Sequence, residues 1–183
     1  MTFDYKGYPL HFIQKQPSND ESDHLFTLIY KFYSPVTNYY YVLRAEYHKE
    51  DVFALKFYCK KDKRSDYKYS KIINKGDVGN ILISCALAVP LLLKDYPSAS
   101  FAFAGARSID FDSRKVENYQ KNQRFRIYRD VAAKKFGNKT FAHYEFEDLS
   151  AYLLLNRQYE DVEEHKEAII SMFASTYNNL PDI

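Results

Sequence analysis

The chain has 183 residues, of which 46% are hydrophobic and 27% charged, so it can form one folded domain with a sizeable core and is not intrinsically disordered. Its 18 Tyr and 14 Phe residues favour β-sheet, because aromatic rings fit the half-buried surface of a strand. The net charge of +2 hides a division, since residues 1–55 carry −2, residues 56–139 carry +11 and residues 140–183 carry −7. Such a division indicates either a polyanionic partner or an acidic region that folds over the basic one.

The sequence carries no signal for secretion or membrane insertion. It opens without the basic and apolar stretches of a signal peptide. Its longest apolar run, residues 81–93, covers 13 residues, whereas a helix needs about 20 to span a bilayer. Two cysteines, Cys59 and Cys85, are too few for a disulfide framework or a four-ligand zinc site. We therefore expect a soluble, cytoplasmic protein that does not associate with a membrane.

The first 75 residues alternate aromatic or β-branched runs with polar turns, which is typical of an antiparallel meander. A hairpin is expected around residues 34–38, between two of the strands. A turn after residue 59 is expected to lead into one further strand of the meander, over residues 67–73. The other strands are expected over residues 8–14, 25–33, 39–47 and 52–59.

From residue 77 onward the apolar residues recur at helical spacing. Asp77 is expected to be the N-cap of a helix over residues 78–93, and Gly137 the C-cap of a second helix over residues 122–136. Between these helices, residues 108–121 are polar and without pattern, and we expect them to form a mobile loop. The remaining expected elements are strands over residues 100–104, 140–146 and 151–155 and an acidic helix over residues 159–177.

Together these elements predict a single α+β domain over residues 1–183, with an antiparallel sheet of five to seven strands and about three helices packed mainly on one face. In the last helix, Val162, His165, Ile169 and Met172 share one apolar stripe. His165 is therefore expected in the core. The same stripe could instead close a homodimer.

Four arginines form the leading candidate site. Arg107 follows an expected strand and a glycine, while Arg124, Arg126 and Arg129 lie near the start of the next helix. Guanidinium groups bind phosphate and carboxylate with two hydrogen bonds, and a helix N-terminus adds free N–H groups. The four arginines therefore predict an anion-binding site. The alternative is that they pair with the acidic residues of the C-terminal third.

The arrangement of a meander, an apolar helix that ends near a proline, the Gly-Ala-Arg of residues 105–107 and the Arg-Phe-Arg-Ile-Tyr-Arg of residues 124–129 resembles a family of small uncharacterised bacterial α+β proteins. In that family a Gly-Ser/Thr segment leads into an Arg-x-Arg-x-Tyr-Arg helix. The resemblance covers roughly residues 25–150, and this chain differs by the loop at 108–121 and by Ala106 in place of a hydroxyl residue. It implies an α+β fold and carries no established activity.

A second basic patch consists of Lys60, Lys61, Lys63 and Arg64, with tyrosines on either side in the sequence. Basic residues interleaved with aromatic ones are typical of grooves that bind single-stranded nucleic acid, where bases stack on the rings. The alternative is that these lysines only solvate a hairpin or protect an edge strand.

The sequence offers few catalytic arrangements. Cys85 lies in an apolar helix and is expected in the core, because a reactive cysteine needs an accessible, electropositive setting. The five histidines show no metal-ligand spacing. Glu145 and Glu147 would share one strand face and could bind Mg²⁺ for phosphodiester cleavage. His143 beside Glu145 could serve as an acid or base without a metal.

We expect a non-enzymatic protein whose basic centre binds an anionic partner, with nucleic acid as the leading candidate, and with neither a cofactor nor a bound metal. One alternative is an interaction module or homo-oligomer in which the acidic C-terminal helix forms the contact. The other alternative is a small nuclease.

Overall fold

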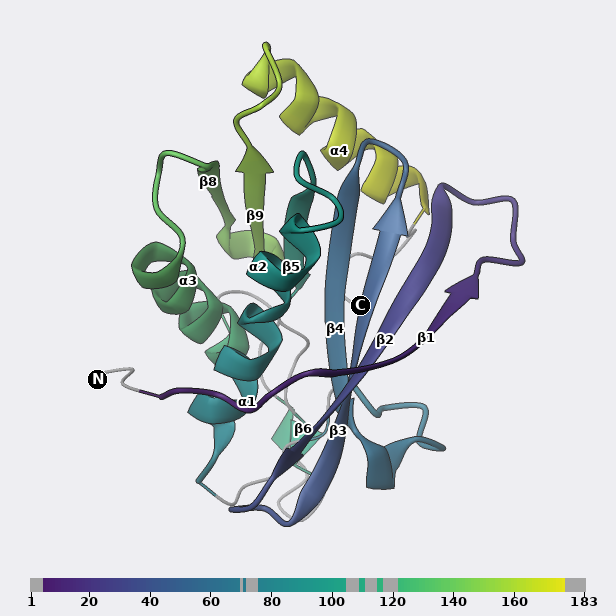
Figure 1. The fold of residues 1–183 in the computed structure, drawn as a ribbon, viewed down its shortest axis with the longest axis vertical. Helices are drawn as coiled ribbons and strands as arrows, with labels where there is room; N and C mark the ends of the chain where they lie inside the picture. The colour runs from purple at the N-terminus through teal and green to yellow at the C-terminus, as the bar shows by residue number, and fades with distance from the viewer. Residues whose placement is uncertain are drawn as a thin grey trace.

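Seven strands form one sheet in the order β1-β2-β3-β4-β5-β9-β8 (Figure 1). The computed structural model describes residues 5–69, 71, 76–104, 109–110, 115–116 and 122–176. Every neighbouring pair in this sheet is antiparallel except β4 and β5, which are parallel. The predicted α+β class is confirmed.

The first four strands form the expected antiparallel meander. Alternation places Phe32, Tyr41 and Leu43 on the inner, buried face, and the residues between them on the outer face. The strand expected over residues 67–73 is not formed at residues 67–69, because residues 66–69 form turns in which Ser65 accepts a hydrogen bond from the Tyr67 N–H. Lys71 takes part in a single β-bridge, and residues 70, 72 and 73 lie outside the described part of the chain. The strands are β1 (His11–Pro17), β2 (His24–Ser34), β3 (Tyr39–His48) and β4 (Val52–Cys59).

Helices α1 (Val78–Ala86) and α2 (Ala88–Leu93) carry the chain from β4 to β5 (Ser100–Ala104). Parallel neighbours need such a crossover, because a tight turn can only join antiparallel strands. The single helix expected here is interrupted at Leu87. Pro90 explains the break, since it has no N–H for the carbonyl of Ala86 and its ring crowds that carbonyl.

Asp77 precedes α1 as expected but does not cap it with its side chain. Its carboxylate instead accepts hydrogen bonds from the Tyr8 hydroxyl at 2.8 Å, the Asn80 amide at 2.9 Å and the Ser34 hydroxyl at 2.5 Å. The buried carboxylate therefore joins the N-terminal segment, the end of β2 and the start of α1.

After β5, two short strands, β6 (Ile109–Asp110) and β7 (Lys115–Val116), pair with each other within the stretch expected to be a loop. The other residues of 108–121 lie outside the described part of the chain. Helix α3 (Gln123–Lys135) follows. Its N-cap is Asn122, whose side chain accepts a hydrogen bond from the Phe125 N–H at 2.9 Å.

The end of α3 differs from expectation. Phe136 is extended at the C-terminal boundary, and Gly137 does not adopt the left-handed backbone of a glycine cap. Phe136 packs edge-on against Phe141, so the chain turns directly into the next strand. That strand is β8 (Phe141–Phe146). The short 3₁₀ helix η2 (Glu147–Leu149) joins it to β9 (Ala151–Asn156). In the sheet, β9 lies between β5 and β8.

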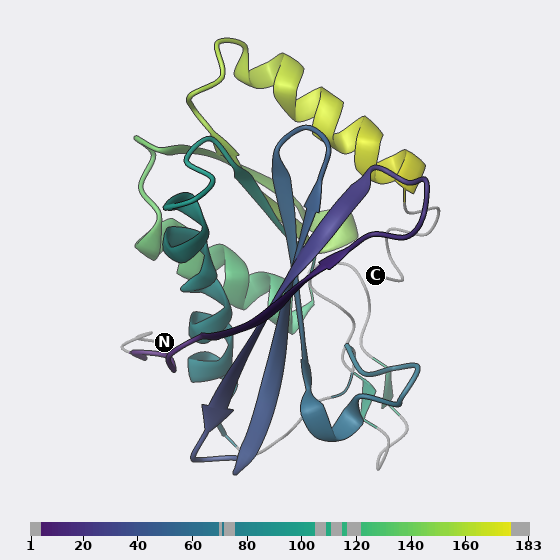
Figure 2. The same cartoon turned by 45° about the vertical axis from the view of Figure 1, so that its right-hand side comes forward.

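The helices cover both faces of the sheet (Figure 2). Helices α1, α2 and α3 pack on the inner face over the larger core, in which Phe32, Phe53, Phe101 and Phe125 are fully buried. Helix α4 (Val162–Thr176) packs on the outer face over a smaller core. The strands contribute Val52, Ala142, Leu153 and Leu155 to this core. The helices thus pack mainly on one face, as expected. The expected helix over residues 78–93 supplies two of the three there, and the acidic helix covers part of the other face.

The apolar stripe of α4 faces the sheet of its own chain. His165, Ile169 and Met172 are buried, which confirms His165 as a core residue. Glu163, Glu164 and Glu167 on the same helix are exposed. The helix packs against residues of β4, β5, β8 and β9, and it lies at the end of the sheet opposite to the β2–β3 hairpin (Figure 1).

Candidate nucleic-acid interface

A basic segment follows β4 at the end of the molecule opposite to α4 (Figures 1 and 2). We use this name for residues 60–71, which contain six basic and two acidic side chains. The segment opens with the 3₁₀ helix η1 (Lys60–Asp62) and continues in turns. The four predicted patch residues are exposed here: Lys60, Lys61, Lys63 and Arg64.

Two tyrosines stand next to this segment on the outer face of the sheet. Tyr33 of β2 and Tyr40 of β3 are directly opposite in register, and their ring centroids are 5.0 Å apart. Their exposed fractions are 38% and 46%, which is high for aromatic residues inside strands. The Tyr33 hydroxyl donates a hydrogen bond to the side chain of Asn38 in the hairpin turn, so the first ring is held in place.

Lysine side chains connect the tyrosines to the basic segment. Lys31 Nζ lies 4.8 Å and Lys60 Nζ 6.0 Å from the centroid of the Tyr40 ring. Lys61 Nζ lies 4.5 Å from the centroid of Tyr39, a half-buried ring that packs against the inner core. We call Lys31, Tyr33, Tyr40 and Lys60 the tyrosine–lysine surface. It combines exposed rings with cations at distances typical of cation–π contacts.

A buried ionic cluster lies under the neighbouring part of the sheet face. Glu46 is buried and lies 3.2 Å from Lys56 Nζ and 3.4 Å from Arg44 Nε. Burial by itself would raise the pKa of Glu46, but Lys56 and Arg44 hold it below its usual value. These two cations are therefore committed to a carboxylate within the protein and are not part of the exposed basic surface.

Arg124 has a structural position. Only 9% of it is exposed, and its guanidinium donates hydrogen bonds to the backbone carbonyls of Tyr69 and Lys71, the latter at 3.1 Å. The guanidinium carbon also lies 4.9 Å from the centroid of the Phe57 ring. Arg124 thus ties the end of the basic segment to α3 and β4.

The other predicted arginines lie apart from Arg124. Arg126 is exposed, and Arg129 Nε lies 3.5 Å from the carboxylate of Asp130. Arg129 is close enough to Tyr152 to oppose the rise in its pKa to about 12 that burial and Glu145 cause. Arg107 lies outside the described residues. The four-arginine anion site remains a prediction.

His143 contacts the buried Tyr152. The expected arrangement of Glu145 and Glu147 on one strand face is not found. His143 Nδ1 lies 2.6 Å from the Tyr152 hydroxyl. Glu145 is in β8, but the strand ends at Phe146 and Glu147 begins η2, so the two carboxylates do not share a strand face. Within the described part of the chain, no group of three or more His, Cys, Asp or Glu side chains could hold a metal ion.

Both cysteines are buried, and neither forms a disulfide within the part of the chain that the structure describes. Burial raises the pKa of Cys85, which keeps this thiol protonated and unreactive. The expectation that Cys85 is a core residue is confirmed.

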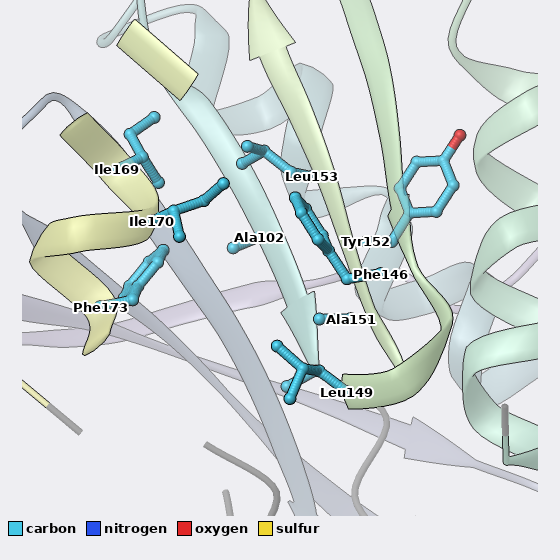
Figure 3. Close-up of a pocket in the computed structure, with 10 residues that line it drawn as sticks. Ala102, Phe146, Leu149, Ala151, Tyr152, Leu153, Ile169, Ile170 and Phe173 are labelled. Carbon is cyan, nitrogen blue, oxygen red and sulfur yellow. The ribbon is translucent and has the colours of Figure 1, made fainter. Parts of the chain in front are cut away.

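An apolar pocket of about 90 Å³ lies between α4 and the sheet (Figure 3). Ile169, Ile170 and Phe173 form its helical side, and Phe146 and Leu149 face them. Its floor consists of the small residues Ala102, Ala104 and Ala151. The Tyr152 hydroxyl points away from it (Figure 3). The pocket therefore presents no acid, base or anion-binding group.

Lys31, Tyr33 and Tyr40 were not among the residues predicted from the sequence. The available signal was their spacing, because Tyr33 and Tyr40 flank the hairpin at positions of the same parity as other outward-facing residues. Recognising the pair required the register of β2 against β3 as well as the position of the basic segment.

Comparison of the chain with protein-family models, with curated proteins and with solved structures found no match. The resemblance to the small bacterial α+β family therefore stays a prediction. None of the described helices has the length and apolar character needed to cross a membrane.

Proposed function

We propose that this protein binds nucleic acid through the tyrosine–lysine surface and the adjoining basic segment. The observation that carries the proposal is the contact of the exposed Tyr40 ring with Lys31 and Lys60, beside three further exposed cations, Lys61, Lys63 and Arg64. Phosphates attract such cations and release bound counterions, while exposed rings offer faces on which bases can stack. Two buried cysteines that form no disulfide within the described residues suit the reducing cytoplasm in which we place the protein.

The charge distribution supports this proposal. Lys60, Lys61, Lys63 and Arg64 form no ion pair with an acidic side chain among the residues that the structure describes. The acidic helix α4 lies at the other end of the molecule (Figure 2). Lys166 of α4 instead contacts Glu163 at 2.7 Å and Glu167 at 3.5 Å. The positive potential of the basic segment is thus left to act on a partner.

Fluorescence anisotropy with labelled single-stranded DNA and RNA of roughly 15 nucleotides tests the proposal. The double variant Lys60→Gln/Lys61→Gln should bind about tenfold more weakly than the unmodified protein, because two phosphate contacts are lost. Lys135→Gln/Lys139→Gln is the matched control, since it removes the same charge from exposed positions near the end of α3. Equal affinities for both variants would refute the assigned surface, and cleavage of the probe would favour a nuclease instead.

A further inference from the structure

This inference rests on the proposed function and names the form of its ligand. We infer that Tyr33 and Tyr40 are a stacking platform for unpaired bases, so that the protein binds single-stranded nucleic acid in preference to a duplex. The bases of a duplex are stacked within it, and a ring on a protein surface reaches them only when the strands are separated.

The geometry of the pair leaves ring surface for a ligand. The two ring planes are inclined by 50° at a centroid distance of 5.0 Å, so neither ring covers the other face to face. By contrast, Phe32 and Tyr41, the next residues along the same strands, are buried and stack at 12° on the inner side of the sheet. The inner pair serves the core, and the outer pair is open to solvent.

The neighbouring lysines are placed to bind the backbone of a strand whose bases reach the tyrosines. Lys60 Nζ is 6.0 Å from the Tyr40 centroid, at the outer limit of a cation–π contact. Its ammonium can therefore move to a phosphate at small cost when a base approaches the ring. Lys61, Lys63 and Arg64 follow Lys60 in the basic segment and are exposed as well.

A structural explanation of the pair also exists. Cross-strand aromatic pairs stabilise hairpins, and the hydrogen bond from Tyr33 to Asn38 fits that purpose. The two explanations differ in what an aliphatic substitution does. A residue needed only for the hairpin affects unfolding, whereas a stacking platform affects the affinity for bases and leaves the affinity for other polyanions unchanged.

The experiment compares Tyr33→Leu/Tyr40→Leu with Tyr33→Phe/Tyr40→Phe, using anisotropy with a single-stranded DNA, a single-stranded RNA, a duplex of the same sequence, and competition by heparin. We expect the unmodified protein to prefer the single strands to the duplex by tenfold or more. The leucine variant should lose about tenfold or more on the single strands and keep its heparin affinity, while the phenylalanine variant stays within about threefold of the original. A difference between the DNA and RNA probes would assign the source of the bases.

Thermal unfolding of each variant identifies any loss of fold, and the single variant Tyr40→Leu replaces the double variant if that one is unfolded. Leucine and phenylalanine variants that bind the single strand equally well would overturn the inference. If Lys60→Gln/Lys61→Gln still weakens binding in that case, the proposed function stands without the stacking platform. No binding of the unmodified protein to any oligonucleotide or to heparin would overturn both.

Discussion

At the scale of single residues, buried polar side chains determine how the basic end of the molecule is held. Arg124, Glu46 and Asp77 are all buried. Arg124 and Asp77 join parts of the chain that are distant in sequence, and Glu46 joins the neighbouring strands β3 and β4. A buried polar group is costly unless it is paired, so the partners of these three residues are fixed by the fold. Lys60, Lys61 and Lys63, by contrast, are exposed.

Arg124→Met should lower the free energy of unfolding by about 1.5–3 kcal/mol, because it leaves the carbonyls of Tyr69 and Lys71 without their charged donor. Arg126→Met is the matched control and should change it by no more than about 0.5 kcal/mol, since Arg126 is exposed. Urea unfolding measures both. Equal effects would contradict the structural assignment of Arg124.

His48 makes stability depend on pH. Its side chain is fully buried, and this burial lowers its pKa from 6.5 to about 4, although a hydrogen bond to the Glu46 carbonyl partly opposes the shift. Between these two values the unfolded chain binds more protons than the folded one, so stability falls as the pH falls. Between pH 7 and pH 5, His48 alone should lower the free energy of unfolding by about 2 kcal/mol. Most carboxylates titrate below this range.

Urea unfolding at several pH values between 7 and 5 measures this loss. His48→Asn should be less stable at pH 7 and show a shallower pH dependence. The pKa of His165 is also lowered, mainly by burial, so a smaller slope of the same sign remains in the variant. His11→Asn, at an exposed position of β1, should leave the slope unchanged. If His48→Asn does not reduce the dependence of the free energy of unfolding on pH, then His48 binds protons equally in the folded and the unfolded chain.

At the scale of elements, α4 is held by a short apolar stripe and a small core. Ile169 and Met172 contact the sheet through Val52, Leu153 and Leu155, and the pocket beside them remains unfilled. Of the acidic residues of the helix, Glu163 accepts a hydrogen bond from the Tyr144 hydroxyl of β8 at 2.9 Å, while Glu164 and Glu167 are exposed. The apolar attachment of α4 therefore depends on few side chains.

Ile169→Ala should lower the free energy of unfolding by about 2–5 kcal/mol, since it enlarges an existing cavity that cannot collapse easily. The matched control Glu167→Ala, on the exposed face of the same helix, should cost no more than about 0.5 kcal/mol. Chemical denaturation compares the two. Similar small effects would mean that the stripe is not packed on the sheet.

The same elements show what the sequence could predict. The ranges of β2, β3 and β4 were predicted to within a residue, because alternation over long aromatic strands is a strong local signal. The placement of β9 between β5 and β8 was not, since strand order depends on contacts between distant segments. The buried stripe of α4 was likewise predictable, whereas the sheet face it covers was not.

The candidate site divides in the same way. Lys60, Lys61, Lys63 and Arg64 were predicted as an exposed patch from local charge alone. The place of Tyr33 and Tyr40 beside them follows from hairpin register, and the bonds of Arg124 to Tyr69 and Lys71 follow from contacts across more than 50 residues of sequence. Neither has a signature in a single local pattern.

At the scale of the whole molecule, the acidic C-terminal helix is separated in space from one basic cluster of the middle third of the chain. The acidic helix α4 and the basic segment lie at opposite ends of the sheet (Figure 1). Helices α1, α2 and α3 pack on the inner face, opposite to the face that α4 covers. A molecule of this kind approaches a polyanion with its basic end first, and the approach weakens as salt screens the charges. The proposed function therefore predicts a strong dependence on ionic strength.

The measurement that tests this account most directly is the salt dependence of binding to a labelled single strand. The logarithm of the binding constant should fall linearly with the logarithm of salt concentration, with a slope of about −0.7 for each phosphate contact. The variant Lys60→Gln/Lys61→Gln should make that slope shallower by about 1.4, because two phosphate contacts are lost. The control Lys135→Gln/Lys139→Gln should leave the slope unchanged. Binding that is insensitive to salt, or slopes that are the same in all three proteins, would contradict a phosphate-binding basic end.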